Sequence, residues 1–563
     1  MNVLGIHIGH DSSASLISNG KIVADIAEER FTRVKHYAGF PALSISECLE
    51  IGGLKISDID VVAVASSYKQ ESLDYFFDLK GCKSEKDFLR GMAKFLLKPI
   101  MPDRVKRPPL YMKRFPLKSS ALICHVDHHT AHAASAYYTS GLEEPQLIIT
   151  MDGVGDHGIS MTISRGEKGK ITLLKAFHQN ASLGWFYGNV TEALDWHHGD
   201  GEGKTMGLAP YGDFTKTRGV LEGFYPKFEN GDLVKAHNFG TPCYWNDNGS
   251  FQWHFNDADK IKKIVEKYGK EDVSAEAQRI LEEEAGKIIY PWLEKEKLSN
   301  LSCAGGVFLN VKLNQRVWES GKVIKHHICP NAGDAGLSMG AALKVYHDLN
   351  PGSPILGLNH LYLGPAYSNE KIKDILDARN LKYEFVEDIA SFTAKLLADN
   401  KIVGWFQGRM ESGPRSLGGR AILMSPLKEE NKDIINARVK FREAFRPFCP
   451  SVLIEKGKDY LVRYRPECFM ITSFDVQPKK KKAVPAVVHV DGTLRPQTVS
   501  RDVHPRYWEL IKAFGDKTGE YIILNTSFNI KGEPIICHPR EAIRCFYDTG
   551  LDYLVMGNYV LKK

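Results

Sequence analysis

The sequence lacks long apolar runs and any large excess of charge of one sign. No window reaches the roughly 18 continuous apolar residues that a membrane helix needs. The first residues, MNVLGIHIGHDSS, contain His and Asp where a signal peptide needs an apolar stretch. Lys and Arg number 74 against 68 Asp and Glu, and this net charge of +6 disfavours the concentrated basic surface of a nucleic-acid-binding protein. We therefore expect a cytoplasmic protein with no membrane and no nucleic-acid partner, and with small anions as ligands.

Paired cysteines are also missing. The ten cysteines are scattered along the chain, and none forms a CxxC pair. A disulfide scaffold would be short and much denser in Cys, and the same scatter disfavours structural zinc. We predict that these cysteines are reduced and mostly buried.

The length and composition indicate a multidomain globular protein. At 563 residues the chain is too long for one hydrophobic core and suits about two to four domains. Hydrophobic residues at 43%, charged at 25% and aromatic at 10% exclude wholly disordered, collagenous and fibrous classes. The clearest linker is LNPGSPILGLNHLYLGP, which is rich in Pro and Gly. The sequence thus predicts one domain over residues 1–358 and a second over residues 359–563.

A hairpin signal occurs twice in the first of these segments. VLGIHIGHDSSASLISNGKIVADIAEER reads as strand, polar loop, strand, a tight Asn19-Gly20 turn and a third strand. LIITMDGVGDHGISMTISRGEKGKITLL has the same pattern, and His7 and Asp11 are spaced like Asp152 and Asp156. Two unrelated hairpins are the simple alternative. The repeat favours a duplicated α/β domain in which each half offers one loop to a shared cleft.

Four side chains in this segment are candidate metal ligands. His128 and His132 stand at i and i+4 in the helix candidate HHTAHAASAYY, the spacing of a helical ligand pair, whereas His129 should point elsewhere. Asp152 ends a buried strand, and Asp334 stands in the Gly-flanked turn NAGDAG. Two histidines at this spacing alone more often lie on a solvent-exposed helix face than bind a metal. With both aspartates the pair forms an N/O set that suits Fe²⁺, Mn²⁺, Zn²⁺ or Mg²⁺ acting on a polyphosphate.

Glycines and one lysine are candidate phosphate contacts. Gly153, Gly155, Gly305 and Gly306 follow apolar strands, where a missing Cβ lets backbone N–H groups approach a phosphate. The second pair introduces a helix, whose N-terminus favours anions. Lys204 stands in GDGEGKTMG, which fails the spacing of a Walker loop. This lysine either neutralises a phosphate or is an ordinary surface lysine.

The second predicted domain is rich in cations. Arg and Lys side chains match phosphate or carbamoyl phosphate, and surface ion pairs are the alternative. Asn525 and Ser527 end the apolar strand YIIL, share one face and could bind an amide or a nucleotide. The lysine run 479–482 is expected to be a solvated loop. The candidate cations are Arg415, Lys440, Arg442, Arg446, Arg495 and Arg501.

Taken together, the motifs resemble those of the O-carbamoyltransferases of the NodU/CmcH type. The resemblance is carried by GHDSSASL, EERFTRVKH, DHHTAHAASAYY, DGVGD, GKTMGLAPYG, GGVFLN, NAGDAG, PRSLGGRAIL, FREAFRPF, RPQTV and NTSFNIKGEPI. These motifs run in the family's order from residue 9 to about residue 535, so the resemblance covers nearly the whole chain. As a set they are highly specific, whereas any one of them is weak.

The resemblance implies both a fold and a reaction. The fold is α/β, with a duplicated actin/Hsp70-like domain (ASKHA superfamily, Kae-type) followed by an α/β YrdC-like domain. Carbamoyl phosphate and ATP would form carbamoyl adenylate in the YrdC-like domain. The first domain would then transfer the carbamoyl group to a hydroxyl of a natural-product or sugar-like small molecule, with release of AMP. Homodimer formation is left open.

The resemblance also implies roles for individual residues. His10, in GHD, and Lys35, in RVKH, match the acceptor and transfer site, with His10 as general base. Arg446 and Asn525 are added on local grounds, and Asn310 ends the GGVFLN motif among the nucleotide-binding candidates. The metal-ligand positions are His128, His132, Asp152 and Asp334, with Fe²⁺ favoured over Mn²⁺ and Mg²⁺. The positions that match the site for carbamoyl phosphate and ATP are Arg415, Lys440, Arg495 and Ser527.

Other functions are supported less well. HypF-type maturation proteins and threonylcarbamoyl transferases would share the chemistry but act on a macromolecule. A sugar kinase would have no use for the cation-rich second domain. A nucleotide-binding regulator would have no use for the candidate metal ligands. The sequence does not identify the acceptor molecule. The aromatic and basic segment 67–120 is predicted either to border the acceptor pocket or to be a helical surface insertion.

Overall fold

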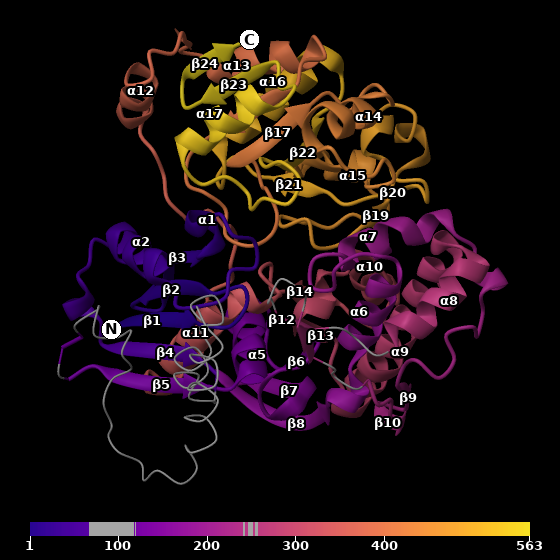
Figure 1. Cartoon of the computed structure of the whole chain (residues 1–563). Coiled ribbons are helices and arrows are strands. Elements are labelled where there is room, and N and C mark those ends of the chain that lie inside the picture. The colour runs from indigo at the N-terminus through magenta and orange to yellow at the C-terminus, as the bar shows by residue number, and fades with distance from the viewer. Residues whose placement is uncertain (67–116, 119, 240–242, 246–250, 254–256) are drawn as a thin grey trace.

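A computed structural model of the chain describes residues 1–66, 117–118, 120–239, 243–245, 251–253 and 257–563 (Figure 1). The proposed acceptor-pocket segment 67–120 lies almost wholly outside the described residues. Figure 1 shows two sheet-bearing halves side by side, with the C-terminal domain above both. None of the described helices is long and apolar enough to cross a bilayer.

The first half is built on the N-terminal hairpin. The turn between its second and third strands uses Asn19 and Gly20, whose φ angles of 48° and 79° are the positive values that a tight hairpin turn requires. β1 then pairs in parallel with β4, and β4 with β5, which gives the order β3-β2-β1-β4-β5. The strands are β1 (Asn2–His7), β2 (Ser13–Ser18), β3 (Lys21–Ala27), β4 (Val61–Ala65) and β5 (Leu122–Val126).

The second half repeats this topology. β6, β7 and β8 form an antiparallel meander, and β6 pairs in parallel with β13 and β13 with β14. The order β8-β7-β6-β13-β14 therefore matches that of the first sheet strand for strand. The duplication predicted from the two hairpins is confirmed by this match. The strands are β6 (Gln146–Met151), β7 (Ile159–Glu167), β8 (Lys170–His178), β13 (Asn300–Ala304) and β14 (Lys325–Ile328).

Two helices pack against each other between the sheets. α5 (His128–Tyr138) covers β6 and β13, and α11 (Leu337–Leu349) covers β1, β2 and β4. The helices approach closely because a Cβ on Gly340 would lie 2.0 Å from the carbonyl oxygen of Ala131. A glycine is thus required where they cross, and the core between the halves combines residues of these two helices with strand residues of both sheets.

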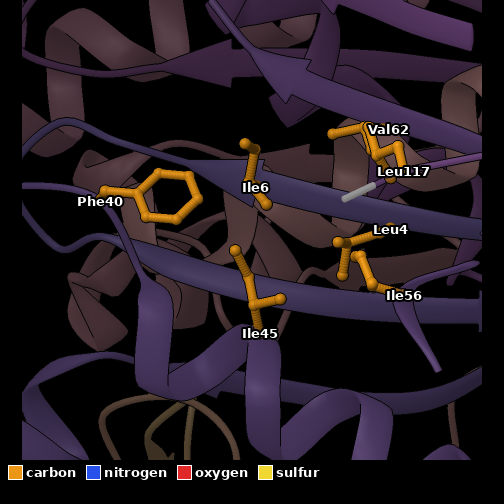
Figure 2. Close-up of a pocket in the computed structure, with 7 residues that line it drawn as sticks. All are labelled: Leu4, Ile6, Phe40, Ile45, Ile56, Val62 and Leu117. Carbon is orange, nitrogen blue, oxygen red and sulfur yellow. The ribbon is translucent and has the colours of Figure 1, made fainter. Parts of the chain in front are cut away.

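The remaining elements of the N-terminal part surround the halves. α2 (Ala42–Gly52) covers β2 and β3, and a small cavity beneath it is lined only by apolar side chains (Figure 2). We assign this cavity no role in chemistry. The others are α1 (Glu29–Thr32), α6 (Leu183–Ala193), α7 (Glu202–Leu208), α8 (Ala258–Tyr268), α9 (Lys270–Glu296), α10 (Val311–Glu319), β9 (Lys227–Glu229), β10 (Asp232–Lys235), β11 (Cys243–Trp245) and β12 (Phe251–Trp253).

The C-terminal part contains a mixed sheet of order β15-β24-β23-β16-β17-β22-β18-β21, which confirms the α/β class. Its strands are β15 (Glu384–Phe385), β16 (Val403–Phe406), β17 (Arg420–Met424), β18 (Cys449–Leu453), β21 (Gln497–Val499), β22 (Ile522–Ser527), β23 (Tyr553–Met556) and β24 (Tyr559–Lys562). β19 (Phe474–Asp475) and β20 (Thr493–Leu494) form a separate pair. The helices are α12 (Asn369–Asp377), α13 (Ile389–Ala398), α14 (Asn431–Ile435), α15 (Gly457–Tyr460), α16 (Pro505–Thr518) and α17 (Pro539–Asp548).

Two smaller predictions can be compared with this fold. The eight cysteines whose side chains the structure describes are all free, and six of them are buried. In the lysine run, Lys479, Lys481 and Lys482 are exposed as expected, but Lys480 is half-buried and pairs with Glu520, 2.6 Å away. Three lysines of the run are therefore solvated, and Lys480 is held by its ion pair. The boundary at residue 358 stays a prediction, although no helix or strand occupies residues 350–368.

Candidate functional site

The four predicted metal ligands come together between the two halves. The side chain of Asp127 caps α5 by accepting a hydrogen bond from the Thr130 amide, so the helix begins at His128. Asp152 follows β6, and Asp334 opens the turn before α11. The potential ligand atoms of His128, His132, Asp152 and Asp334 all lie within 4.8 Å of one another.

Asp152 lies between the two imidazoles of this cluster. Its Oδ2 atom is 3.2 Å from the Nε2 atoms of both His128 and His132, and Asp334 Oδ1 is 3.5 Å from His132 Nε2. Burial alone would lower the pKa of His132, but its hydrogen bonds to both carboxylates raise the pKa to about 9. Those imidazoles in turn hold the pKa of Asp152 well below its usual range despite its burial. Two imidazole nitrogens and two carboxylates in a buried pocket fit a divalent cation of the first transition row or Mg²⁺.

His129 serves a different purpose on the same helix. It is 1% exposed, its Nδ1 lies 2.7 Å from Thr150 Oγ1 and its Nε2 lies 3.0 Å from the Ile159 carbonyl oxygen. Burial lowers the pKa of His129 to about 3. As predicted from the helical period, this neutral imidazole points away from the cluster and ties α5 to the second sheet.

The predicted phosphate-binding glycines pack around the ligands. A Cβ on Gly155 would lie 2.4 Å from the His128 ring, and one on Gly306 would lie 2.9 Å from Asp152 Oδ1. The amides of Gly153, Gly155 and Gly305 donate hydrogen bonds to Asp152 Oδ1 and to the carbonyls of Ile159 and Ala332. These three amides are therefore already used within the chain. A phosphate contact from them stays a prediction, whereas the close approach to the ligands explains the glycines directly.

His10 links the cluster to a chain of charged groups. Its Nε2 lies 3.3 Å from Asp334 Oδ2 and its Nδ1 lies 3.1 Å from Asp11 Oδ2, while the ring itself is exposed. Asp334 is the main cause that raises the pKa of His10. Asp11 also accepts a hydrogen bond from His36 Nδ1 at 2.7 Å. An exposed imidazole beside the cluster is accessible to a ligand from solvent.

Lys35 is joined to the same chain through a residue that the sequence analysis did not select. Asp200 forms an ion pair with Lys35 and lies 3.6 Å from His36 Nε2. Asp11, His36 and Asp200 are thus three members of the site that sequence reasoning missed. The signal was present, because each stands next to a selected residue or inside a quoted motif, GHD, RVKH or GDGEGKTMG.

Two nucleotide-binding candidates already have partners within the chain. Lys204 Nζ lies 3.4 Å from Glu443 Oε1 and 5.7 Å from the Trp196 ring centre, so it faces the C-terminal domain. Asn310 caps α10 by accepting from the Leu313 amide and exchanges two hydrogen bonds with Gln278. The predicted roles of both residues stay predictions.

The cations of the C-terminal domain form a second cluster. Within the described part of the chain, no carboxylate lies in ion-pair range of Arg415, Lys440, Arg442 or Arg495, and Arg446 is 3.8 Å from Glu443. Burial and, to a lesser extent, the neighbouring Arg495 together lower the pKa of Arg415 to about 9. Burial and the neighbouring Arg446 likewise lower the pKa of Arg442 to about 9. Buried and half-buried cations that repel one another are suited to bind a polyanion.

Lys440 is positioned at the end of β22. Its Nζ lies 3.2 Å from Ser527 Oγ and 2.7 Å from Asn529 Oδ1. Burial holds the pKa of Lys440 well below its usual range. Asn525, on the same strand, is 1% exposed and donates to the Ser416 carbonyl, so its amide supports the site from inside the sheet. Arg501 was expected with the cations, but it is exposed and its guanidinium lies 5.4 Å from the Trp508 ring centre.

Comparison with known proteins identifies the family. The model described as "Carbamoyltransferase N-terminus" matches residues 2–343, and "Carbamoyltransferase C-terminus" matches residues 394–563. The nodulation protein NolNO of Sinorhizobium fredii is 36% identical over 560 residues, covering 98% of this chain and 79% of the relative. The nodulation protein NolO of Bradyrhizobium diazoefficiens is 37% identical over 451 residues, with 78% and 79% covered.

Solved structures match only distantly. Full-length HypF in its phosphate- and nucleotide-bound form has a TM-score of 0.31 and 12% identity, over 62% of this chain and 47% of HypF. That similarity is too low to support an argument about either fold or function. The family assignment rests instead on the two family matches, of which the first alone spans more than half of the sequence. The chain belongs to the carbamoyltransferase family and is a transferase enzyme.

Proposed function

We propose that the chain is an ATP-dependent O-carbamoyltransferase with two clefts, one that makes carbamoyl adenylate and one that transfers its carbamoyl group to a small-molecule hydroxyl. The proposal assigns the first step to a YrdC-like C-terminal domain and the second to an actin/Hsp70-like N-terminal domain. The observation that carries it is the cluster of Arg415, Lys440, Arg442 and Arg495, which has no carboxylate partner among the described residues. Family membership alone does not require a polyanion site in this domain.

The C-terminal cluster would neutralise the phosphates of both co-substrates. Water releases inorganic phosphate from carbamoyl phosphate, and an oxygen of the resulting carbamate attacks the α-phosphorus of ATP while pyrophosphate leaves. Arg415 and Arg495 offer planar forks for phosphate oxygens, and Lys440 offers a point charge. The step turns a carbamate, which has a poor leaving group, into a mixed anhydride whose leaving group is a stabilised phosphate anion.

The N-terminal cluster would hold a divalent cation through His128, His132, Asp152 and Asp334. When bound there, the cation would supply positive charge for phosphate oxygens of the adenylate. His10, exposed beside the cluster, would accept the proton of the acceptor hydroxyl as its oxygen attacks the carbamoyl carbon. Lys35 would balance negative charge on the departing AMP, whose bond to the carbamoyl carbon breaks in this step.

The proposed reaction is tested by its nucleotide product. Incubation of the full chain with ATP, carbamoyl phosphate and Fe²⁺ or Mn²⁺ should yield AMP and pyrophosphate, and chromatography separates AMP from ADP. ADP as the sole nucleotide product would indicate a kinase and would overturn the proposal. The acceptor class is tested by mass spectrometry of hydroxylated metabolites, including sugars, that gain one carbamoyl group.

A further inference from the structure

The contact between the two domains contains a buried carboxylate that the proposed chemistry does not use. Asp25, on β3, is 1% exposed. It accepts hydrogen bonds from the hydroxyls of Ser15 and Ser412 and, at 3.3 Å, from Asn331 Nδ2. Within the described residues no cation lies in ion-pair range of Asp25. Burial raises the pKa of Asp25, and these hydrogen bonds oppose that rise, so the carboxylate depends on all three partners.

Two of the three partners of Asp25 belong to the loops that carry the two clusters. Asn331 stands three residues before Asp334, a member of the ligand cluster, and Ser412 stands three residues before Arg415, a member of the cation cluster. One carboxylate on β3 therefore joins both loops by hydrogen bonds. The Ser412 hydroxyl makes this bond across the domain interface, 387 residues away in the sequence.

Two arginines extend the same contact. Arg33 Nη1 donates to the Ile535 carbonyl at 2.8 Å, and Arg33 Nη2 donates to the Pro534 carbonyl at 2.7 Å. Arg30 Nη2 donates to the Gly413 carbonyl at 2.7 Å. Both arginines come from the short helix α1 and the residue after it, which lie against the C-terminal domain in Figure 1. A guanidinium that forks between two backbone carbonyls fixes the relative position of two segments.

These contacts join segments of the chain that contain residues of both proposed steps. Arg33 stands two residues before Lys35 and three before His36, both of which belong to the charged chain that leads to His10. Arg33 contacts residues 533–535. These residues follow Asn529, which accepts a hydrogen bond from Lys440. Asp25, Arg30 and Arg33, which we call the clamp, therefore connect residues 33–36 to two segments that carry the cation cluster. One segment leads to Arg415 and the other follows Asn529.

We propose that Asp25 and Arg33 are positioning residues that hold the cation cluster of the C-terminal domain against residues 33–36, so that the activated carbamoyl group is transferred before water reaches it. This inference rests on the proposed function. Neither side chain touches the reacting atoms. Without the clamp, carbamoyl adenylate escapes, water attacks its carbamoyl carbon, the bond to the AMP oxygen breaks, and the carbamic acid formed decomposes to carbon dioxide and ammonia.

Acceptor-independent turnover tests the clamp in the full chain. With ATP and carbamoyl phosphate but no acceptor, the unmodified enzyme should release pyrophosphate in one burst and then slowly. Arg33→Ala and Ser412→Ala should each raise the slow rate severalfold, because the intermediate leaks and is hydrolysed. A merely structural role would lower the rate instead. Lys312→Ala, which removes the interdomain ion pair with Asp491, 2.5 Å away, is the matched control and should leave the rate unchanged.

Amide hydrogen exchange separates failure of the clamp from failure of the proposed function. Exchange in residues 409–415 should be faster in Arg33→Ala and Ser412→Ala than in the unmodified protein or Lys312→Ala. Unchanged exchange in both variants overturns the clamp whether or not the enzyme makes AMP. In enzyme that does make AMP, an unchanged or lower slow rate of pyrophosphate release overturns the role in retaining the intermediate. Absence of AMP from the unmodified enzyme counts against the proposed function alone.

Discussion

His10 Nε2 lies 3.3 Å from Asp334 Oδ2, so the proposed general base and one proposed metal ligand are in direct contact. Asp334 belongs to the second half of the duplicated domain, and His10 belongs to the loop between the first two strands of the first half. The duplication therefore has a chemical consequence, because each half contributes one of these two adjacent groups. The following predictions test whether the ligand cluster serves carbamoyl transfer and the cation cluster serves adenylate formation.

Removal of one buried imidazole should remove the metal. His132→Ala takes away a fully buried nitrogen that lies 3.2 Å from Asp152, so we expect loss of the bound cation and of carbamoyl transfer, with adenylate formation retained. Elemental analysis of the purified protein measures the bound cation, mass spectrometry of the carbamoylated acceptor measures transfer, and pyrophosphate release measures adenylate formation. His129→Ala is the matched control, since it deletes an equally buried imidazole from the same helix but outside the ligand cluster, and its metal content should be unchanged. Equal loss of both activities in His132→Ala would contradict the division of labour.

Removal of one arginine from the cation cluster should have the opposite effect. Arg415→Ala should lower the rate of adenylate formation by about 100-fold, since charge-assisted contacts to phosphate are lost in a half-buried site. Transfer from supplied carbamoyl adenylate should continue. The exposed Arg501 provides the control, because Arg501→Ala removes the same charge from the same domain but outside the cluster. A similar loss in both variants would show that net charge, and not the cluster, is responsible.

A methyl group beside His128 should disturb the ligand cluster. The Cβ of Gly155→Ala would lie 2.4 Å from the ring, so the imidazole must move. Displacement of a ligand or its support weakens metal affinity by about 10- to 100-fold, which a competition assay with a chelating dye can measure. Gly203→Ala on α7, where a Cβ meets no atom within 4 Å, should leave the affinity unchanged. Unaltered affinity in Gly155→Ala would mean that His128 is not a ligand.

A buried histidine should make stability depend on pH. Burial lowers the pKa of His504 to about 4, and its Nδ1 accepts a hydrogen bond from the Tyr507 amide at the start of α16. The native state holds this ring neutral, so its contribution is fully present above pH 6.5, the unfolded pKa, and is lost as the pH falls toward 4. His504→Ser keeps a capping group but removes the titration. The urea midpoint of the variant should therefore fall less between pH 7 and pH 5 than that of the unmodified protein.

The sequence predicted the parts of the site whose signals are local. The spacing of His128 and His132, and the aspartates after apolar segments, sufficed to identify the ligand cluster that the structure brings together. Arg501 was grouped with the cations, but its exposed guanidinium lies over the ring of Trp508 on α16, a contact that no local pattern reveals. Asp25 was missed for a related reason. In VADIAEER it reads as an ordinary strand residue, and its partner Ser412 is 387 positions away.

The crossing of α5 and α11 has a consequence beyond packing. His132 follows Ala131 directly on α5, and Asp334 opens the turn before α11, six residues before Gly340. The backbones at Ala131 and Gly340 leave no room for a Cβ at position 340. A larger residue at this position, although not among the candidate ligands, would therefore push the two helices apart and change the separation of the candidate ligands His132 and Asp334.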